Sequence, residues 1–224
     1  MIVAIHQIQF MPGLRFFSKM KDCDLFVFLD DVQYEKREYQ NRNKIKTTDG
    51  WQYLTLPVLT KGRFEQNINE VLINKDINWR EEHLKKIRLN YARSAFFDEY
   101  YPEIEKIYAK EHKRLIDISL DLIYFFRKAL SLTTPYKFSS EFDIKTKSTE
   151  RLIDICKALK ADKYLSGFGA KSYLDENKFK ENKIEIIWQD FKIKKYNQLY
   201  GDFIENMSVL DLIFNEGKNS INYL

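Results

Sequence analysis

The sequence predicts a mixed α/β protein with a mainly parallel central sheet, flanking helices and a helical insert. Three observations support this class. Short apolar runs of strand length occur at residues 2–5, 25–29 and 184–188. Segments with helical spacing separate these runs, and residues 79–130 have helical spacing throughout. We therefore expect residues 1–224 to form a single α/β domain with a helical insert at about 79–130.

The composition is that of an ordinary globular protein. Hydrophobic residues make up 44% of the chain and charged residues 31%, which excludes a disordered or collagenous chain. The net charge is +4, and the 37 Lys and Arg residues are interspersed with 33 Asp and Glu residues rather than gathered in blocks. Nucleic acid is therefore not an expected partner. Cys23 and Cys156 lie far apart and are expected to be reduced core thiols, with no metal site. Because no signal peptide and no long apolar run are recognisable, we expect a cytoplasmic protein without a membrane span.

Residues 1–31 predict a β-α-β unit. A buried strand at 2–5 delivers His6 at its end, and Pro12 stands at a plausible first position of a helix. The apolar stripe of this helix consists of Phe10, Leu14, Phe17 and Met20. The second strand, 25–29, is apolar throughout and ends at Asp30, as expected of a strand covered on both faces. The crossover should be right-handed, so both strand ends should lie on one edge of the sheet.

The middle of the chain changes character twice. Residues 33–46 are polar and aromatic without a clear period, residues 53–58 predict another strand, and residues 71–73 predict a further short one. One amphipathic helix carries Leu84, Ile87 and Tyr91. A second, longer helix should begin after Pro102 and extend to about Phe125.

The last third of the chain alternates again between helix and strand. A helix is expected at 149–160, with Ser148 or Thr149 as its cap, followed by short strands at 164–165 and 184–188. A final helix at 208–214 should begin with Ser208 and Asp211 as a capping box and end at Gly217. His83 and His112 stand among charged residues of predicted helices, so we expect both at the surface.

The first candidate site lies at the expected ends of the first two strands. It comprises His6, Gln7, Gln9, Asp30, Asp31 and Gln33. Neighbouring strands lie about 4.8 Å apart, so these side chains can converge on one ligand, with a histidine or carboxylate as the general base. The alternative is that Asp30 and Asp31 merely end the strand while His6 bonds to a backbone carbonyl.

Two further segments carry groups suited to anions. Asn41, Arg42, Asn43 and Lys44 concentrate amide and cationic donors, although surface loops have the same composition. Residues 166–170 form a glycine-containing turn, whose backbone N–H groups can approach a phosphate. This turn lacks the spacing of a Rossmann fingerprint or a P-loop, so an ordinary turn is the alternative.

Several ordered motifs together resemble a known family. They are His6-Gln7-x-Gln9-Phe10-x-Pro12, Phe16-Phe17-x-Lys19, residues 28–34, residues 41–45, residues 164–167, Tyr173-Leu174-Asp175, Tyr196-x-Gln198 and residues 208–211. This set resembles the WbqC-like family of bacterial surface-polysaccharide gene clusters and spans nearly the whole chain. The chain departs from the family pattern at Ile8, where proline is usual, and at Arg15, which adds a cation.

The resemblance implies a role in making O-antigen, the glycan of lipopolysaccharide, or a similar surface glycan. The β-α-β opening is also distantly similar to nucleotidylyltransferase-like (HUP-type) proteins, although the second histidine of their H-x-G-H signature is absent. The leading hypothesis is an acyl- or aminoacyltransferase that forms an amide on a nucleotide-linked amino sugar. The alternatives are a nucleotidylyltransferase-like enzyme and a non-catalytic binding or assembly protein.

The leading hypothesis assigns roles to particular residues. The expected catalytic residues are His6, Asp30 and Asp31. The expected substrate-binding residues are Gln7, Gln9, Phe10, Lys19, Gln33, Asn41, Arg42, Asn43, Lys44, Ser166, Gly167, Gly169, Tyr173 and Gln198. Arg42, Lys44 and the backbone of Gly167 to Gly169 would bind phosphates. ATP with Mg²⁺ and an acyl donor are the candidate co-substrates, and a homodimer is the candidate assembly.

Overall fold

The computed structural model describes residues 1–224 and contains a five-stranded parallel sheet. The strand order is β5-β2-β1-β6-β7. The strands are β1 (Ile2–Gln7), β2 (Leu25–Leu29), β5 (Tyr136–Phe138), β6 (Lys163–Ser166) and β7 (Glu185–Trp188). Every neighbouring pair in this sheet is parallel, which confirms the mixed α/β class with a mainly parallel sheet.

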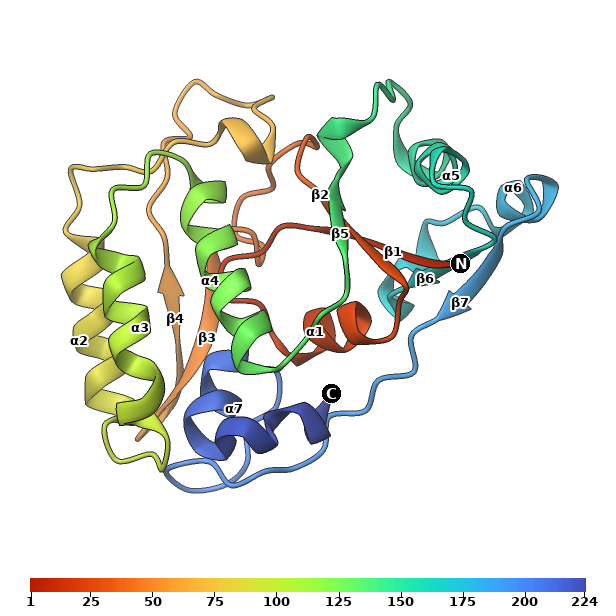
Figure 1. Ribbon diagram of the computed structural model, residues 1–224. Helices are drawn as coiled ribbons and strands as arrows, with labels where there is room; N and C mark the ends of the chain where they lie inside the picture. The colour runs from red at the N-terminus through yellow and green to blue at the C-terminus, as the bar shows by residue number, and fades with distance from the viewer.

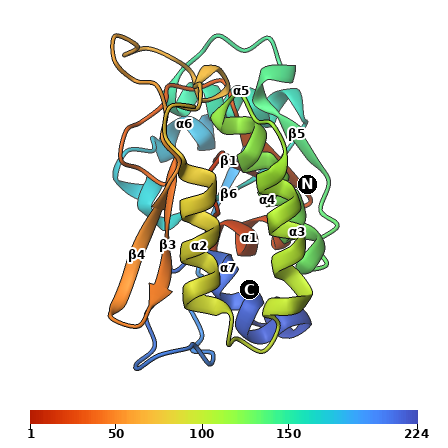
Figure 2. The same cartoon turned by 90° about the vertical axis from the view of Figure 1, so that its left-hand side faces the viewer.

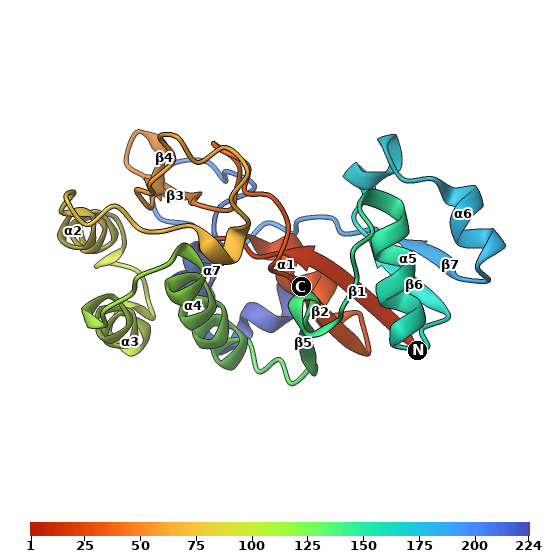
Figure 3. The same ribbon diagram turned by 90° about the horizontal axis from the view of Figure 1, so that it is seen from above.

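Helices cover both faces of this sheet (Figures 1 and 3). The first face packs against α1 (Leu14–Lys21), α4 (Leu115–Ala129) and α7 (Val209–Glu216), and the second against α5 (Ser148–Ala158) and α6 (Glu176–Glu181). Phe17, Phe126 and Phe214 bring the first three helices into one buried cluster, whereas Ile155 and Phe179 belong to a separate cluster. The sheet therefore separates two hydrophobic cores.

The alternation of side chains along β1 decides where its polar end residues point. Ala4 belongs to the core on the α1 side, and Ile5 belongs to the core on the α5 side. Successive side chains of a strand point to opposite faces. His6 therefore follows Ala4 to the α1 side, and Gln7 follows Ile5 to the α5 side.

Residues 79–130 form three helices where the sequence predicted two. They are α2 (Trp79–Tyr91), α3 (Phe97–Ala109) and α4, which Figure 2 shows beside a two-stranded ribbon. The predicted helix start after Pro102 is wrong, because α3 begins at Phe97 and runs through this proline. The missing N–H of a helical proline leaves one carbonyl unpaired, here that of Asp98. Both residues are exposed, so water can bond to that carbonyl.

The ribbon consists of β3 (Arg42–Thr47) and β4 (Gly50–Thr55), which pair antiparallel. We did not predict β3, because a buried Asn43 interrupts the apolar face that a strand usually shows. The strand predicted at 53–58 ends earlier, at Thr55. Residues 71–73 make only isolated bridges. Gly50 has a φ of 122°, which explains a glycine at the turn between the two strands.

The capping predictions are confirmed in α7 only in part. Ser208 accepts a hydrogen bond from the N–H of Leu210 at 3.3 Å, and the helix ends at Gly217 with a φ of 54°. Asp211 is not part of a capping box, because its buried carboxylate bonds to side chains outside the helix. In α5, neither Ser148 nor Thr149 caps the helix by a side-chain hydrogen bond.

Buried histidines are a second difference from the sequence predictions. His83 lies 3.2 Å from the Tyr108 hydroxyl and 3.1 Å from the Thr55 carbonyl, and Nε2 of His112 lies 2.9 Å from Asp121. Both histidines are buried, so the prediction of surface positions is wrong. Their charged sequence neighbours belong to the outer faces of the same segments. The two cysteines are buried free thiols, as predicted, and no helix has the length and apolar character needed to cross a membrane.

Candidate functional site

The strand order reverses between β1 and β6. From β1 the chain continues to β2 and β5 on one side, whereas β6 and β7 lie on the other. Ligands of open α/β sheets bind in the crevice beyond the carboxyl ends of the strands at such a reversal. Ala4 is paired with Leu165, and continuing this register by two places sets His6 opposite Gly167. These two residues therefore mark the crevice.

His6 is held as a neutral imidazole with one free nitrogen. Its Nδ1 lies 2.9 Å from the carbonyl oxygen of Gln7. Because a carbonyl only accepts, Nδ1 carries the proton and Nε2 carries the lone pair. Burial, helped by the charge of Lys19, lowers the pKa of His6 to about 3. Nε2 makes no hydrogen bond within the protein, so it is available to a ligand.

His6 lines a pocket of about 300 Å³, which we call the His6 pocket. The lining residues are His6, Gln9, Gly13, Leu14, Arg15, Phe16, Tyr39, Asn43, Ile193 and Asn206. Three of them are neutral amides, one is a cation, and none is a carboxylate. Gly13, Leu14 and Arg15 are the first residues of α1 and its cap, so the positive end of this helix faces the pocket. The pocket suits a polar ligand with negative charge.

Lys19 of α1 does not line this pocket, but its charge acts on His6 and its Nζ lies close to Gly167, directly after β6. Its side chain is 5% exposed, and its ammonium makes neither an ion pair nor a hydrogen bond within the protein. A Cβ atom at position 167 would lie 3.2 Å from Lys19 Nζ, so the ammonium lies close to the backbone directly after β6. Burial lowers the pKa of Lys19 to about 8.

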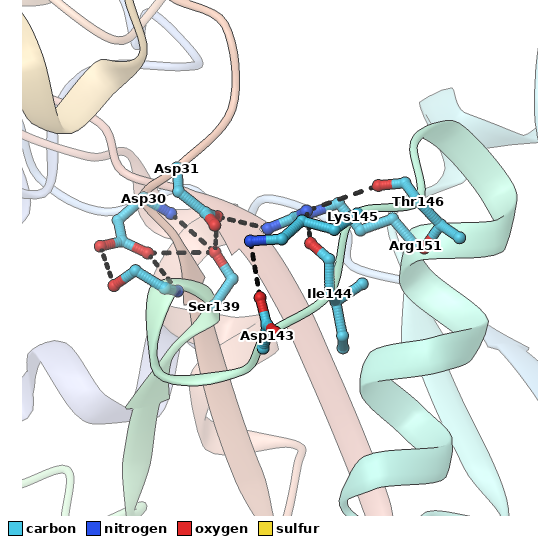
Figure 4. A network of polar contacts seen from close by, with 9 residues as sticks. Asp30, Asp31, Ser139, Asp143, Ile144, Lys145, Thr146 and Arg151 are labelled. Carbon is cyan, nitrogen blue, oxygen red and sulfur yellow. Dashed lines mark hydrogen bonds and ion pairs between the residues drawn. The ribbon is translucent and has the colours of Figure 1, made fainter.

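The aspartates at the end of β2 are engaged in a network that links neighbouring strand ends (Figure 4). Asp30 is buried and accepts hydrogen bonds from Ser140 N at 3.0 Å and Ser140 Oγ at 2.7 Å. Ser139 Oγ lies 3.0 Å from Asp30 and also contacts Asp31. Ser139 and Ser140 follow β5 directly, so Asp30 joins the ends of β2 and β5.

Asp31 belongs to a different pocket on the α5 side of the sheet. It forms an ion pair of 2.6 Å with Arg151 of α5 and lines a polar pocket of about 710 Å³, which we call the Asp31 pocket. Gln7 and Gln33 line the same pocket. The structure therefore does not bring His6 and the aspartates to one ligand. Alternation along β2 places Asp31 with Val27 on the α5 side, whereas the carboxylate of Asp30 is engaged by Ser139 and Ser140.

Two predicted substrate-binding residues, Gln9 and Asn43, line the His6 pocket, and Asn43 also donates to the Met11 carbonyl at 2.8 Å. Arg42 and Lys44 alternate with Asn43 along β3 and lie over aromatic rings instead, at 4.2 Å from Tyr53 and 4.0 Å from Trp51. The phosphate role predicted for this pair is therefore not supported by its position.

The remaining predicted residues are dispersed. Phe10 is in the core, Asn41 donates to the Leu56 carbonyl, and Gln198 donates to Asp211. Ser166 is buried, and its hydroxyl has no hydrogen-bond partner. Gly169 is open, and Tyr173 is 73% exposed. None of these residues lines the His6 pocket.

Besides Gly13, Leu14 and Phe16, four residues that line the pocket were not predicted as site residues from the sequence. They are Arg15, Tyr39, Ile193 and Asn206. Arg15 stands out in the sequence only as a departure from a family pattern. Ile193 and Asn206 come from the irregular segment between β7 and α7, where no period marks an inward position. Only Arg15 carries a usable signal, as a cation in the first turn of the first helix.

Substitution of Asp30 by alanine should destabilise the fold by about 1–3 kcal/mol, because it removes a buried carboxylate that accepts from the backbone N–H and hydroxyl of Ser140 and joins β2 to β5. Urea denaturation measures the loss. The matched control is Asp143→Ala, which removes an exposed carboxylate and should change stability by less than about 0.5 kcal/mol. Equal stabilities of the two variants would show that Asp30 has no structural role.

Comparison with known proteins agrees with the motifs of the sequence. The WbqC-like protein family matches residues 7–223. An uncharacterized protein of Mycobacterium tuberculosis, Rv1507c, is 37% identical over 224 residues, which cover 99% of this chain and 96% of the relative. No solved structure matches the chain significantly. The match over nearly its whole length shows that the chain belongs to the WbqC-like protein family.

Proposed function

We propose that this protein is an enzyme of surface-glycan biosynthesis that transfers an acyl or aminoacyl group to the amino group of a nucleotide-linked sugar. The observation that carries the proposal is the free Nε2 of His6, a neutral imidazole nitrogen at a pocket without carboxylates. The family resemblance supports the glycan context, and the pocket's amides and cation support a polar, anionic substrate. The proposal places the protein in the cytoplasm, as one domain with a helical insert, and retains a homodimer as a prediction.

The chemistry needs one base and an oriented amine. The amine nitrogen attacks the acyl carbonyl carbon, the bond from that carbon to the donor's leaving group breaks, and the leaving group departs with the electron pair. His6 Nε2 accepts the proton that the amine loses. Gln9 and Asn206 offer amide groups that can hydrogen-bond to sugar hydroxyls and orient the amine toward His6.

A second candidate is nucleotidylyl transfer by a nucleotidylyltransferase-like (HUP-type) fold. The strand order favours it, because β1 is the central strand and His6 stands at its carboxyl end. This reaction releases pyrophosphate from a nucleoside triphosphate with Mg²⁺, so a pyrophosphate assay separates it from acyl transfer.

The proposed function is tested with a panel of substrates. The protein is incubated with nucleotide-linked 3-amino and 4-amino sugars and with acyl donors, each with and without ATP and Mg²⁺. The masses of the sugar products are then measured by mass spectrometry. The expected result is a mass gain equal to the acyl group minus one hydrogen. A panel without any gain would contradict acyl transfer. Unchanged glycan output in cells carrying His6→Ala would favour a non-catalytic assembly role.

A further inference from the structure

Lys19 is a buried charge without a partner in a chain that has 33 acidic residues. Ammonium groups removed from water are costly unless they are paired and hydrogen-bonded. Phe16, Phe17 and Met20 of α1 are buried beside Lys19, and its Nζ lies close to Gly167. The ammonium therefore lies at the end of β6 without an anionic partner.

Three observations near Lys19 favour an anionic ligand. The His6 pocket contains Arg15 and no carboxylate. The first turn of α1, which faces this pocket, has no acidic residue and no side-chain cap. The strand reversal between β1 and β6 is where ligands of such sheets bind. Helix starts and cations placed in this way attract phosphate groups.

We propose that Lys19 is the phosphate-binding residue of the site, and that it holds a phosphate group of the substrate beside Gly167 at the strand reversal. The ammonium donates hydrogen bonds to phosphate oxygens, and Arg15, which donates to the Phe191 carbonyl at 3.0 Å, adds positive charge to the pocket wall. The identification of this phosphate as part of a nucleotide-linked sugar rests on the proposed function. The phosphate site replaces the assignment to Arg42 and Lys44, which lie over Tyr53 and Trp51.

Phosphate binding at Lys19 also affects the base. The charged or titratable groups around His6 are Lys19 and Arg15 of α1 and Tyr39 of the pocket wall. The Lys19 charge, together with burial, lowers the pKa of His6. A bound phosphate offsets this charge, so the pKa of His6 rises when the site is filled. His6 therefore becomes a stronger base only with the substrate in place.

The experiment measures phosphate binding by calorimetry with the full chain and two probes, inorganic phosphate and uridine diphosphate. The test variants are Lys19→Gln and Lys19→Met, and the matched control is Lys44→Gln. Lys19→Met should fold well, because an unbranched apolar side chain replaces a desolvated charge. We expect at least a roughly tenfold weaker affinity in both Lys19 variants and less than about a twofold change in the control. In the wild type, either probe should raise the pKa of His6 in an NMR titration, and in Lys19→Met it should not.

The outcomes separate this inference from the proposed function. Equal affinity of the Lys19 variants and the wild type would overturn the phosphate site, even if acyl transfer to an amino sugar were observed. Tight binding that depends on Lys19, without any acyl transfer, would uphold the site and contradict the proposed function. Affinity for uridine diphosphate but not for inorganic phosphate would identify the nucleotide as the source of the phosphate. An acyl adduct on Lys19 would overturn the inference by making this lysine a nucleophile.

Discussion

Replacement of His6 by alanine is expected to reduce acyl transfer by about 10²- to 10⁴-fold, the usual contribution of a positioned general base. The variant loses the Nε2 lone pair at the His6 pocket and keeps the core intact, because His6 lies at the end of β1. Steady-state rates with the best substrate of the panel measure the effect. The matched variant is Asp31→Asn, which alters the carboxylate of the Asp31 pocket. It should retain activity within about threefold, since it leaves the base unchanged.

The opposite ranking of these two variants would contradict the account. If Asp31→Asn lost activity and His6→Ala kept it, the base would be a carboxylate on the α5 side of the sheet. Urea denaturation of both variants belongs to the test, because Asp31 pairs with Arg151 and a loss of folding would imitate a loss of catalysis.

Replacement of Asp211 by alanine is expected to destabilise the protein by about 3–5 kcal/mol. Its buried carboxylate accepts hydrogen bonds from the hydroxyls of Tyr91 and Tyr196, each at 2.8 Å, and from Gln198 at 3.0 Å. Removal leaves the two buried tyrosine hydroxyls without this acceptor, whereas Gln198 still donates to the Ile204 carbonyl at 3.0 Å. Tyr91 also accepts from the backbone N–H of Lys46 at 2.8 Å, so the network joins α7, α2 and β3.

Urea denaturation followed by circular dichroism measures this loss, with Glu205→Ala as the control at an exposed position of the same segment. The control should change stability by less than about 0.5 kcal/mol. A loss below about 1 kcal/mol for Asp211→Ala would show that the network is dispensable. Burial raises the pKa of Asp211, so the protonated form is favoured in the fold relative to the unfolded chain. The carboxylate's own contribution to stability therefore decreases as the pH rises through its folded pKa.

The central strands could be predicted because they are buried on both faces and therefore appear as continuous apolar runs, at 2–5 for β1 and 25–29 for β2. The edge strand β7 is partly exposed, and only its short apolar run at 184–188 marked it. The ribbon could not be predicted in the same way. Asn43 satisfies its buried amide by donating to the Met11 carbonyl, a contact with a distant loop that the local sequence does not reveal.

Only the part of the site that lies at the ends of strands could be predicted from the residues themselves. His6 and Gly167 were predicted as residues that follow strands, whereas Lys19 was predicted only through the resemblance to the WbqC-like family. The predicted partnership of His6 with Asp30 failed for a physical reason. Adjacency of two strands places residues on one edge, but it does not reveal that the turn after β5 donates hydrogen bonds to the Asp30 carboxylate. The two-residue period of a strand is enough to place His6 and Gln7 on opposite faces of β1.

A crystal structure with a bound nucleotide-linked amino sugar shows directly which face of the sheet binds the substrate. We expect a phosphate against Lys19 Nζ and the sugar amine within hydrogen-bond distance of His6 Nε2. A ligand bound in the Asp31 pocket, against Arg151 on the other face of the sheet, would contradict this expectation.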